Sequence, residues 1–299
     1  MQYLLFFLSI LFLTTTDASE PVVSTLTEIK ATAGMSVSSD GTIYVADFGD
    51  SNTLAGTSLY KLDPAGDIQL ITDQLKTGPS GNILDEDNSI IQSVHRANSV
   101  VRVSQSGNIE TLATGIPGPD DLVKDSQGNL YVVTCPIQGA GAGVYKISTS
   151  GKTTLFALDV AFRCLPGITI DDKGYLYIAD YMTGKVFKIS PTGEYQLFTQ
   201  LPSGGSHIKF ANSVFYVLMP RSNQIAQIDG TGNVTILAGT GERTNRDGLA
   251  SQAAFEFPFH LEVSKDGKKL YVNGGPNGDT ETNPIRVIDL FPKPASQSH

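Results

Sequence analysis

Histidine and paired aspartate are the residues of this chain best suited to chemistry. The chain has 4 histidines in 299 residues; two of them, His207 and His260, lie at the start of strand-like segments, and Asp120 and Asp121 open another. Two imidazoles and a carboxylate can hold a divalent metal ion, calcium or zinc, with one position open for water or substrate. Such a metal would polarise a carbonyl or phosphoryl oxygen and lower the pKa of bound water. The candidate metal ligands are Asp120, Asp121, His207 and His260.

The same residues support two other interpretations. Without a metal, His207 and His260 would act as acid and base on a bound substrate, oriented by the aspartates. With a metal bound, His95 is a third candidate catalytic residue, as the general base. In a structural role, the aspartates would cap turns and the histidines would bond to backbone groups. Residue types alone leave all three interpretations open.

A repeated phrase indicates which elements position these residues. Segment 41–47 (GTIYVAD) recurs as 128–134 and 174–180, and weaker copies start at Asn88, Asn212 and Gly267. Six copies at a period of about 40 to 50 residues, each rich in strand and turn residues, are typical of a β-propeller. A β-sandwich or an open array is the alternative. The predicted fold class is therefore all-β, a six-bladed β-propeller with four-stranded blades.

The fourth unit shows how one blade is built. Strand-like segments at 167–171, 175–180, 185–189 and 195–198 are separated by short turns. The sixth unit has fewer strand-like segments than a complete blade, whereas the strand-like segment around 25–32 has no partner strand in its own unit. We expect this N-terminal segment to complete the last blade and close the ring. The repeated tyrosines, which share one strand register, are expected to pack between blades: Tyr44, Tyr131, Tyr177, Tyr216 and Tyr271.

Innermost propeller strands all start at one mouth of the central channel. This geometry places three of the four histidines on one rim, because His95 lies in a loop on the same face. Loops on that face also supply the candidate substrate-binding residues Arg96, Tyr181 and Arg221. Asp47 and Asp180 end equivalent strands, and we interpret them as structural.

The N-terminal segment and the net charge indicate the cellular location and the kinds of partner. Residues 1–19 combine an apolar run with small and polar residues, as in a secretory signal peptide, so a secreted or periplasmic protein is expected. The propeller would span 20–291, followed by a polar tail at 292–299. A net charge of -9 with scattered lysine and arginine argues against nucleic acid and membrane partners. A small-molecule substrate or a peptide or protein ligand remains, and a monomer is expected.

The two cysteines of a secreted chain are expected to pair. Cys135 ends a strand of the third unit and Cys164 precedes the first strand of the fourth. In a propeller these points lie on one face of adjacent blades, so a Cys135–Cys164 disulfide is predicted, with two separately buried thiols as the alternative.

Several segments resemble known propeller families. Segments 237–241 (LAGTG), 253–255 (AAF) and 257–261 (FPFHL) resemble the inter-blade phrase of NHL-repeat propellers. Segments 89–103 (SIIQSVHRANSVVRV) and 118–123 (GPDDLV) resemble the gluconolactonase and senescence-marker-protein family. The resemblance implies a six-bladed propeller, but such propellers include lactonases, phosphotriesterases, lyases and binding modules.

The chain departs from the lactonase branch at its metal site. Where that family carries a channel glutamate, this chain has Ala33 and Gly34. Its metal-binding asparagines correspond to Asp120 and Pro166, and its aspartate corresponds to Ser206. Proline has no coordinating side chain, so the calcium site of the family is not expected to be preserved as such.

Two functions follow from the sequence. The first is a metal-assisted hydrolase of the lactone or ester class, or a lyase, acting on a small molecule at the channel mouth. The second is a non-catalytic propeller that binds a peptide, glycan or protein through its rim loops. Histidines and aspartates within one coordination distance would favour the first, and histidines bonded only to backbone would favour the second.

Overall fold

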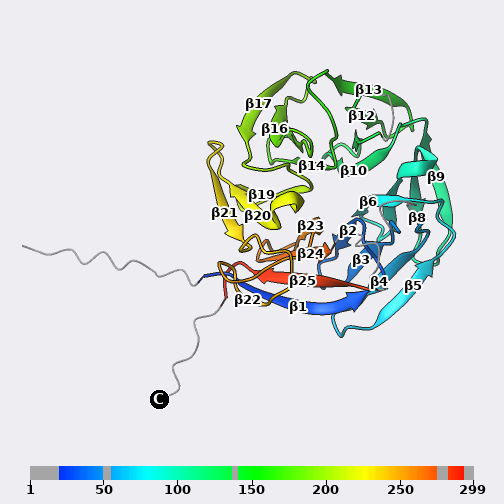
Figure 1. Cartoon of the computed structure of the whole chain (residues 1–299). Coiled ribbons are helices and arrows are strands. Elements are labelled where there is room, and N and C mark those ends of the chain that lie inside the picture. The colour runs from blue at the N-terminus through cyan, green and yellow to red at the C-terminus, as the bar shows by residue number, and fades with distance from the viewer. Residues whose placement is uncertain (1–19, 50–54, 137–140, 275–281, 293–299) are drawn as a thin grey trace, which may run out of the picture.

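The chain forms six antiparallel β-sheets around a common centre, as Figure 1 shows. The computed structural model describes residues 20–49, 55–136, 141–274 and 282–292. The predicted signal peptide (1–19) and all but the first residue of the predicted tail (292–299) lie outside the described residues. The predicted six-bladed β-propeller is confirmed.

The blades follow one another along the chain. From the centre outward, their strands are β2 (Met35–Val37), β3 (Ile43–Ala46), β4 (Leu59–Leu62) and β5 (Ile68–Thr72) in blade 1; β6 (Pro79–Leu84), β7 (Ile90–Val94), β8 (Ser99–Val103) and β9 (Ile109–Thr114) in blade 2; and β10 (Pro119–Lys124), β11 (Leu130–Thr134), β12 (Gly143–Ile147) and β13 (Thr153–Leu158) in blade 3. Blades 4 and 5 contain β14 (Gly167–Ile170), β15 (Leu176–Ala179), β16 (Lys185–Ile189) and β17 (Tyr195–Gln200), then β18 (Ile208–Ala211), β19 (Val214–Met219), β20 (Gln224–Ile228) and β21 (Val234–Ala238). Two 3₁₀ turns, η1 (His95–Ala97) and η2 (Pro220–Ser222), follow β7 and β19. Among the described residues, no helix has the length and hydropathy of a membrane span.

Blade 6 draws strands from both ends of the described chain. Its order from the centre is β23 (Pro258–Val263), β24 (Lys269–Gly274), β25 (Asn283–Asp289), β1 (Val22–Ile29) and the short β22 (Gly248–Leu249). β1 is antiparallel to β25, with Val23 opposite Ile288, and the two strands lie side by side in Figure 1. The N-terminal strand therefore belongs to the last sheet and starts a few residues earlier than the segment predicted from the sequence.

The hydrophobic core lies between the blades. Six clusters of buried side chains each join two neighbouring blades; one of them combines Met35 and Val45 of blade 1 with Tyr271 and Ile285 of blade 6. The repeated tyrosines belong to these clusters, as predicted: Tyr44, Tyr131, Tyr177, Tyr216 and Tyr271. This packing holds the blades in a ring with their first strands toward the centre.

The innermost strands form a continuous ring of contacts. β2 contacts β6, β6 contacts β10, and the sequence continues through β14, β18 and β23 back to β2. The strands run in the same direction through the channel, so the channel has two distinct ends. We call the end where the innermost strands begin the first mouth, and the end where they finish the second mouth.

A disulfide joins blades 3 and 4, which confirms the predicted pairing. Cys135 follows β11 and Cys164 precedes β14, and their sulfur atoms are bonded across a separation of 29 residues. Next to the disulfide, the Leu165 amide donates to the Thr134 carbonyl at 3.2 Å. The cross-link therefore reinforces backbone contacts that already join the two blades.

Removing the cross-link should destabilise the propeller without changing its fold. A Cys135→Ser/Cys164→Ser double variant should lose about 3 kcal/mol of unfolding free energy, because the unfolded chain regains the entropy of an open loop. Urea unfolding followed by far-ultraviolet circular dichroism measures the change, with the reduced wild-type protein as the matched control. An unchanged unfolding midpoint would show that the disulfide contributes no stability.

Candidate functional site

The candidate site residues lie at irregular points of the innermost strands. The register of β10 against β11 shifts between Pro119 and Leu122, which places Asp120 and Asp121 in a β-bulge. β23 has a similar shift between Pro258 and His260. A bulge turns side chains away from their regular alternation. Asp120, Asp121 and His260 therefore depart from the regular alternation of their strands near the first mouth.

Glycines bring the strands that carry the site close together. A Cβ atom on Gly81 would lie 2.6 Å from the Cα of Asp121, and a Cβ atom on Gly167 would lie 2.5 Å from the Cα of His207. Real Cβ atoms do not approach so closely, so only glycine permits these contacts. The backbone positions of Asp121 and His207 are thus fixed by glycines of the preceding blade.

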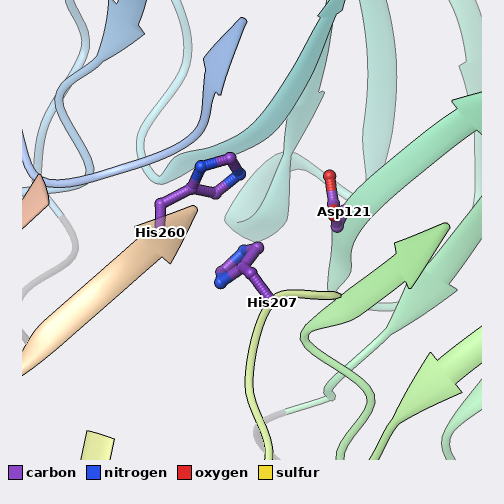
Figure 2. A group of neighbouring side chains, drawn as sticks. All are labelled: Asp121, His207 and His260. Carbon is purple, nitrogen blue, oxygen red and sulfur yellow. The ribbon is translucent and has the colours of Figure 1, made fainter. Parts of the chain in front are cut away.

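Asp121, His207 and His260 form one buried group, shown in Figure 2. One ligand-type atom from each lies within 4.8 Å of the other two. The rings of His207 and His260 have their centroids 4.1 Å apart, and the side chains are 1% and 0% exposed. The predicted convergence is therefore present, but Asp120 is not part of this group.

Backbone hydrogen bonds give the two histidines different tautomers. Nδ1 of His207 lies 2.7 Å from the Phe259 carbonyl oxygen, so this nitrogen carries the proton and Nε2 has a free lone pair. Nδ1 of His260 instead accepts the Met35 amide proton at 3.2 Å, so in the neutral ring the proton is on Nε2. Both Nε2 atoms are buried without a hydrogen-bond partner among the described residues. The pair thus offers one acceptor and one donor.

Burial keeps both imidazoles neutral. It lowers the pKa of His207 from 6.5 to about 4, against the opposing charge of Asp120. Burial also lowers the pKa of His260 well below 6.5, with further contributions from His207 and the Lys209 ammonium. At the two free nitrogens, the neutral His207 ring can accept a proton and the neutral His260 ring can donate a hydrogen bond.

Asp121 is engaged in an ion network. Its Oδ1 accepts the Leu122 amide proton at 2.9 Å, and its Oδ2 accepts from Lys209 Nζ at 3.3 Å. Lys209 Nζ also lies 3.3 Å from Oε2 of Glu262. Burial disfavours the ammonium charge, but Asp121 and Glu262 together raise the pKa of Lys209 above its ordinary value. The carboxylate of Asp121 is therefore already neutralised by a buried cation.

Asp120 has a different environment. Its Oδ1 accepts a hydrogen bond from the Ser80 hydroxyl of blade 2. Burial raises the pKa of Asp120 to about 6, although the charge interaction with His207 opposes the rise. Asp120 is thus placed to interact with a charged His207 imidazole.

With the hydrogen bonds that they make, Asp121, His207 and His260 do not fit a metal centre. An imidazole that binds a metal through Nε2 normally donates its Nδ1 proton to an acceptor. His207 meets this condition, but His260 does not, because Met35 donates to its Nδ1. Asp121 also shares its Oδ2 with the Lys209 ammonium, whose charge opposes a nearby cation. The donor set therefore favours metal-free acid–base chemistry over a three-ligand metal site.

The third candidate histidine has its own partners. Nε2 of His95 donates to the Cys135 carbonyl at 3.0 Å, and its Nδ1 is buried without a partner among the described residues. Ring contacts run from His95 to Phe48, from Phe48 to Phe259, and from Phe259 to His207. Two aromatic rings thus lie between His95 and the histidine pair. His95 is not part of the group formed by Asp121, His207 and His260.

The predicted substrate-binding residues lie on loops at the first mouth. The Arg221 guanidinium stacks 4.6 Å from the centroid of the Tyr181 ring, which joins blades 4 and 5. Arg96 is exposed on η1 of blade 2. Their role in binding stays a prediction.

The two aspartates interpreted as structural bind backbone amides. Asp47 accepts from Gly49, and Asp180 accepts from Met182, Thr183 and Arg163. The structural interpretation is thus consistent with every bond that these carboxylates make in the described chain.

Several important groups were not singled out from the sequence. Lys209 and Glu262 each lie two residues after a site histidine, so strand alternation places them on the same channel-facing side. That spacing is a signal that the sequence contains. The Met35 amide and the Phe259 carbonyl, which set the tautomers, have no sequence signal because any residue type supplies them.

Comparisons with solved structures show that the chain shares its fold with known proteins. No protein-family model matches the chain, and no curated protein matches it. A luciferin-regenerating enzyme superimposes with a TM-score of 0.69 at 12% identity, covering 90% of this chain and 95% of the other. A gluconolactonase from Xanthomonas campestris gives 0.67 at 13% identity over 92% and 96%. A catalytically inactive His-to-Ala variant of virginiamycin B lyase from Staphylococcus aureus, with quinupristin, gives 0.61 at 14% identity over 91% and 100%. At these identities the likeness establishes the fold.

Nuclear magnetic resonance should detect the two tautomers directly. Imidazole nitrogen shifts in ¹⁵N-labelled protein should show a protonated Nδ1 in His207 and a protonated Nε2 in His260 at neutral pH. Both rings should stay neutral as the pH falls to about 5, because burial lowers both pKa values. A protonated Nδ1 in His260 would contradict the assignment and restore the geometry of a metal ligand.

Global stability is a less direct readout of these groups. Between pH 6.5 and about 4, the pKa values of His207 in the unfolded and folded chain, the unfolded chain binds a proton that the folded chain does not, so His207 lowers stability as the pH falls. Between pH 3.8 and about 6, the corresponding pKa values of Asp120, the folded chain holds a proton that the unfolded chain releases, so Asp120 lowers stability as the pH rises. The two effects oppose each other, and each group must therefore be followed separately.

A glycine substitution should test whether the close approach of Gly167 to the backbone of His207 is required for stability. Gly167→Ala should destabilise the fold by about 1 to 3 kcal/mol, because the new methyl group overlaps the backbone of His207. Gly230→Ala is the matched control, since nothing lies within 4 Å of a Cβ atom there. Urea unfolding measures both. Equal stability of the two variants would show that the close approach at Gly167 is not required.

Proposed function

We propose that this protein is a secreted propeller enzyme that acts on a small neutral molecule by metal-free acid–base catalysis. It is a lyase or a hydrolase of the lactone or ester class. His207 and His260 are its proposed catalytic residues, and Asp120 supports His207. The disulfide supports an oxidising compartment such as the extracellular space or the periplasm.

The observation that carries the proposal is the pair of unpartnered Nε2 atoms. Both are fully buried, and both lack a hydrogen-bond partner in the described chain. Leaving such a group unsatisfied costs about 1 to 3 kcal/mol. Two such costs in adjacent rings are consistent with groups kept free for a substrate.

The tautomers suggest a division of roles. The lone pair of His207 Nε2 would accept a proton from water or from a carbon next to a carbonyl, and the charge of Asp120 would stabilise the resulting imidazolium. The Nε2–H of His260 would donate a hydrogen bond to the developing oxyanion, and the His207 imidazolium would return its proton to the leaving oxygen or to the product. A proton taken up and then returned by His207, with the negative charge stabilised by His260, would serve both hydrolysis and elimination.

The comparisons are compatible with this proposal. The neighbours in fold include a gluconolactonase and a luciferin-regenerating enzyme. In virginiamycin B lyase, a His-to-Ala variant is catalytically inactive. These proteins support a small-molecule enzyme as the function class, and the hydrogen bonds of the histidine pair supply the proposed chemistry.

A second candidate function is non-catalytic binding of a peptide, glycan or protein at the first mouth. The stacked Tyr181 and Arg221 favour it, because tyrosine and arginine are common contact residues of binding surfaces. The complete burial of the histidine pair also agrees with it. Under this function the protein would bind without turnover.

Single substitutions should separate the two functions. We expect turnover of a member of a panel of lactones, aryl esters, phosphotriesters and quinupristin, and His207→Gln should lower kcat by a factor of about 100 to 10,000. His95→Gln is the matched control and should retain activity, because Phe48 and Phe259 separate His95 from the histidine pair. Hydrolysis in ¹⁸O-water would label the product acid, whereas elimination would not.

Two results would contradict the proposal. Turnover unaffected by His207→Gln and His260→Gln would exclude the pair as catalytic residues. Absence of turnover across the panel, together with peptide or glycan binding that is lost in Arg221→Ala, would favour the binding propeller.

A further inference from the structure

A cavity lies at the opposite end of the channel from the histidine pair. Its volume is about 330 Å³, at the small end of the range for ligand sites. Each innermost strand contributes a residue at or near its end: Val37, Leu84, Lys124, Ile170, Phe210 and Val263. Because these positions finish their strands, the cavity lies at the second mouth. Exposed Lys265 on its rim shows that it reaches the surface.

An unpartnered hydroxyl lines this cavity. Ser36 is 4% exposed, and its Oγ has no hydrogen-bond partner among the described residues. Its neighbours Met35 and Val37 both belong to the core between blades 6 and 1. Alternation along β2 therefore turns the Ser36 side chain away from that core and toward the channel. A buried hydroxyl without a partner indicates that something else satisfies it.

The cavity also contains an available donor. Lys209 lines it, and the ammonium has three N–H groups but two partners among the described residues, Asp121 and Glu262. These two carboxylates together more than balance the lysine charge. Lys124 is likewise paired with Asp85 and Glu86. The interior thus has hydrogen-bonding groups and an apolar wall without an unbalanced positive charge.

We propose that the second-mouth cavity binds a small neutral molecule with an aliphatic body and one accepting oxygen, such as an aliphatic ketone. The oxygen receives hydrogen bonds from Lys209 Nζ and Ser36 Oγ, and the body packs against the apolar ends of the innermost strands. A carboxylate is disfavoured, because it would lie beside Asp121 and Glu262.

One side chain, Lys209, connects the cavity with the candidate site. Lys209 lines the cavity and contacts Asp121, which belongs to the group with His207 and His260. Binding at the second mouth does not require the histidines to be catalytic. If they are, a ligand there lies against a wall of the reaction site.

Calorimetric titration with 2-octanone tests the proposal, and octanoate serves as a comparison of equal chain length. Wild-type protein should bind 2-octanone, and octanoate should bind about ten-fold or more weakly. Ser36→Ala should weaken 2-octanone binding about three- to ten-fold through the lost hydrogen bond. Ser93→Ala is the matched control, because its hydroxyl is also buried and unpartnered but does not line the cavity. It should bind as the wild type does.

A second variant and a separate readout keep the outcomes distinct. Val263→Phe should fill the cavity and abolish binding, while thermal unfolding verifies that each variant is folded. His207→Gln should retain 2-octanone binding whether or not it loses turnover, which separates this proposal from the proposed function. No binding by wild-type protein, equal binding by Ser36→Ala and wild type, or tighter binding of octanoate would each overturn the proposal.

Discussion

The close approach of the innermost strands is the constraint on which the rest of the structure depends. At Gly81 and Gly167 the backbone of one blade lies where a side chain of any other residue would clash with the next blade. Gly34 makes a similar approach to Ser80, at 2.4 Å for an added Cβ atom. These contacts draw the innermost strands together at the first mouth. Polar residues on the neighbouring strands are consequently buried together in a narrow channel.

Because the channel is buried, ordinary backbone groups determine the protonation of the site histidines. Because the site histidines are excluded from water, the nearest peptide group decides which nitrogen of each ring carries the proton. The Phe259 carbonyl and the Met35 amide make opposite choices, so two adjacent and otherwise similar histidines become an acceptor and a donor. The same low-polarity setting makes the ion network of Asp121, Lys209 and Glu262 necessary, since a lone carboxylate at the position of Asp121 would be costly.

The sequence predicts the architecture more completely than the site. The recurring strand phrase encodes the blade directly, and the tyrosines of that phrase occupy equivalent places between blades because each blade repeats the same packing. The convergence of His207 and His260 also follows, since both positions open innermost strands. Their protonation does not follow, because peptide groups from blades 1 and 6 determine it. The β-bulges at Asp120 and His260 were likewise invisible in the residue pattern, and they decide which neighbouring side chains enter the group.

The central claim is that the buried histidine pair works without a metal. The most direct test is elemental analysis by plasma mass spectrometry of wild-type protein and the His207→Gln variant. Both proteins would be dialysed first against calcium or zinc chloride and then against metal-free buffer. Our account predicts no stoichiometric metal in either protein, because the His260 tautomer and the Lys209 ammonium oppose a cation at this place. One calcium or zinc ion per wild-type chain, absent from the variant, would contradict it.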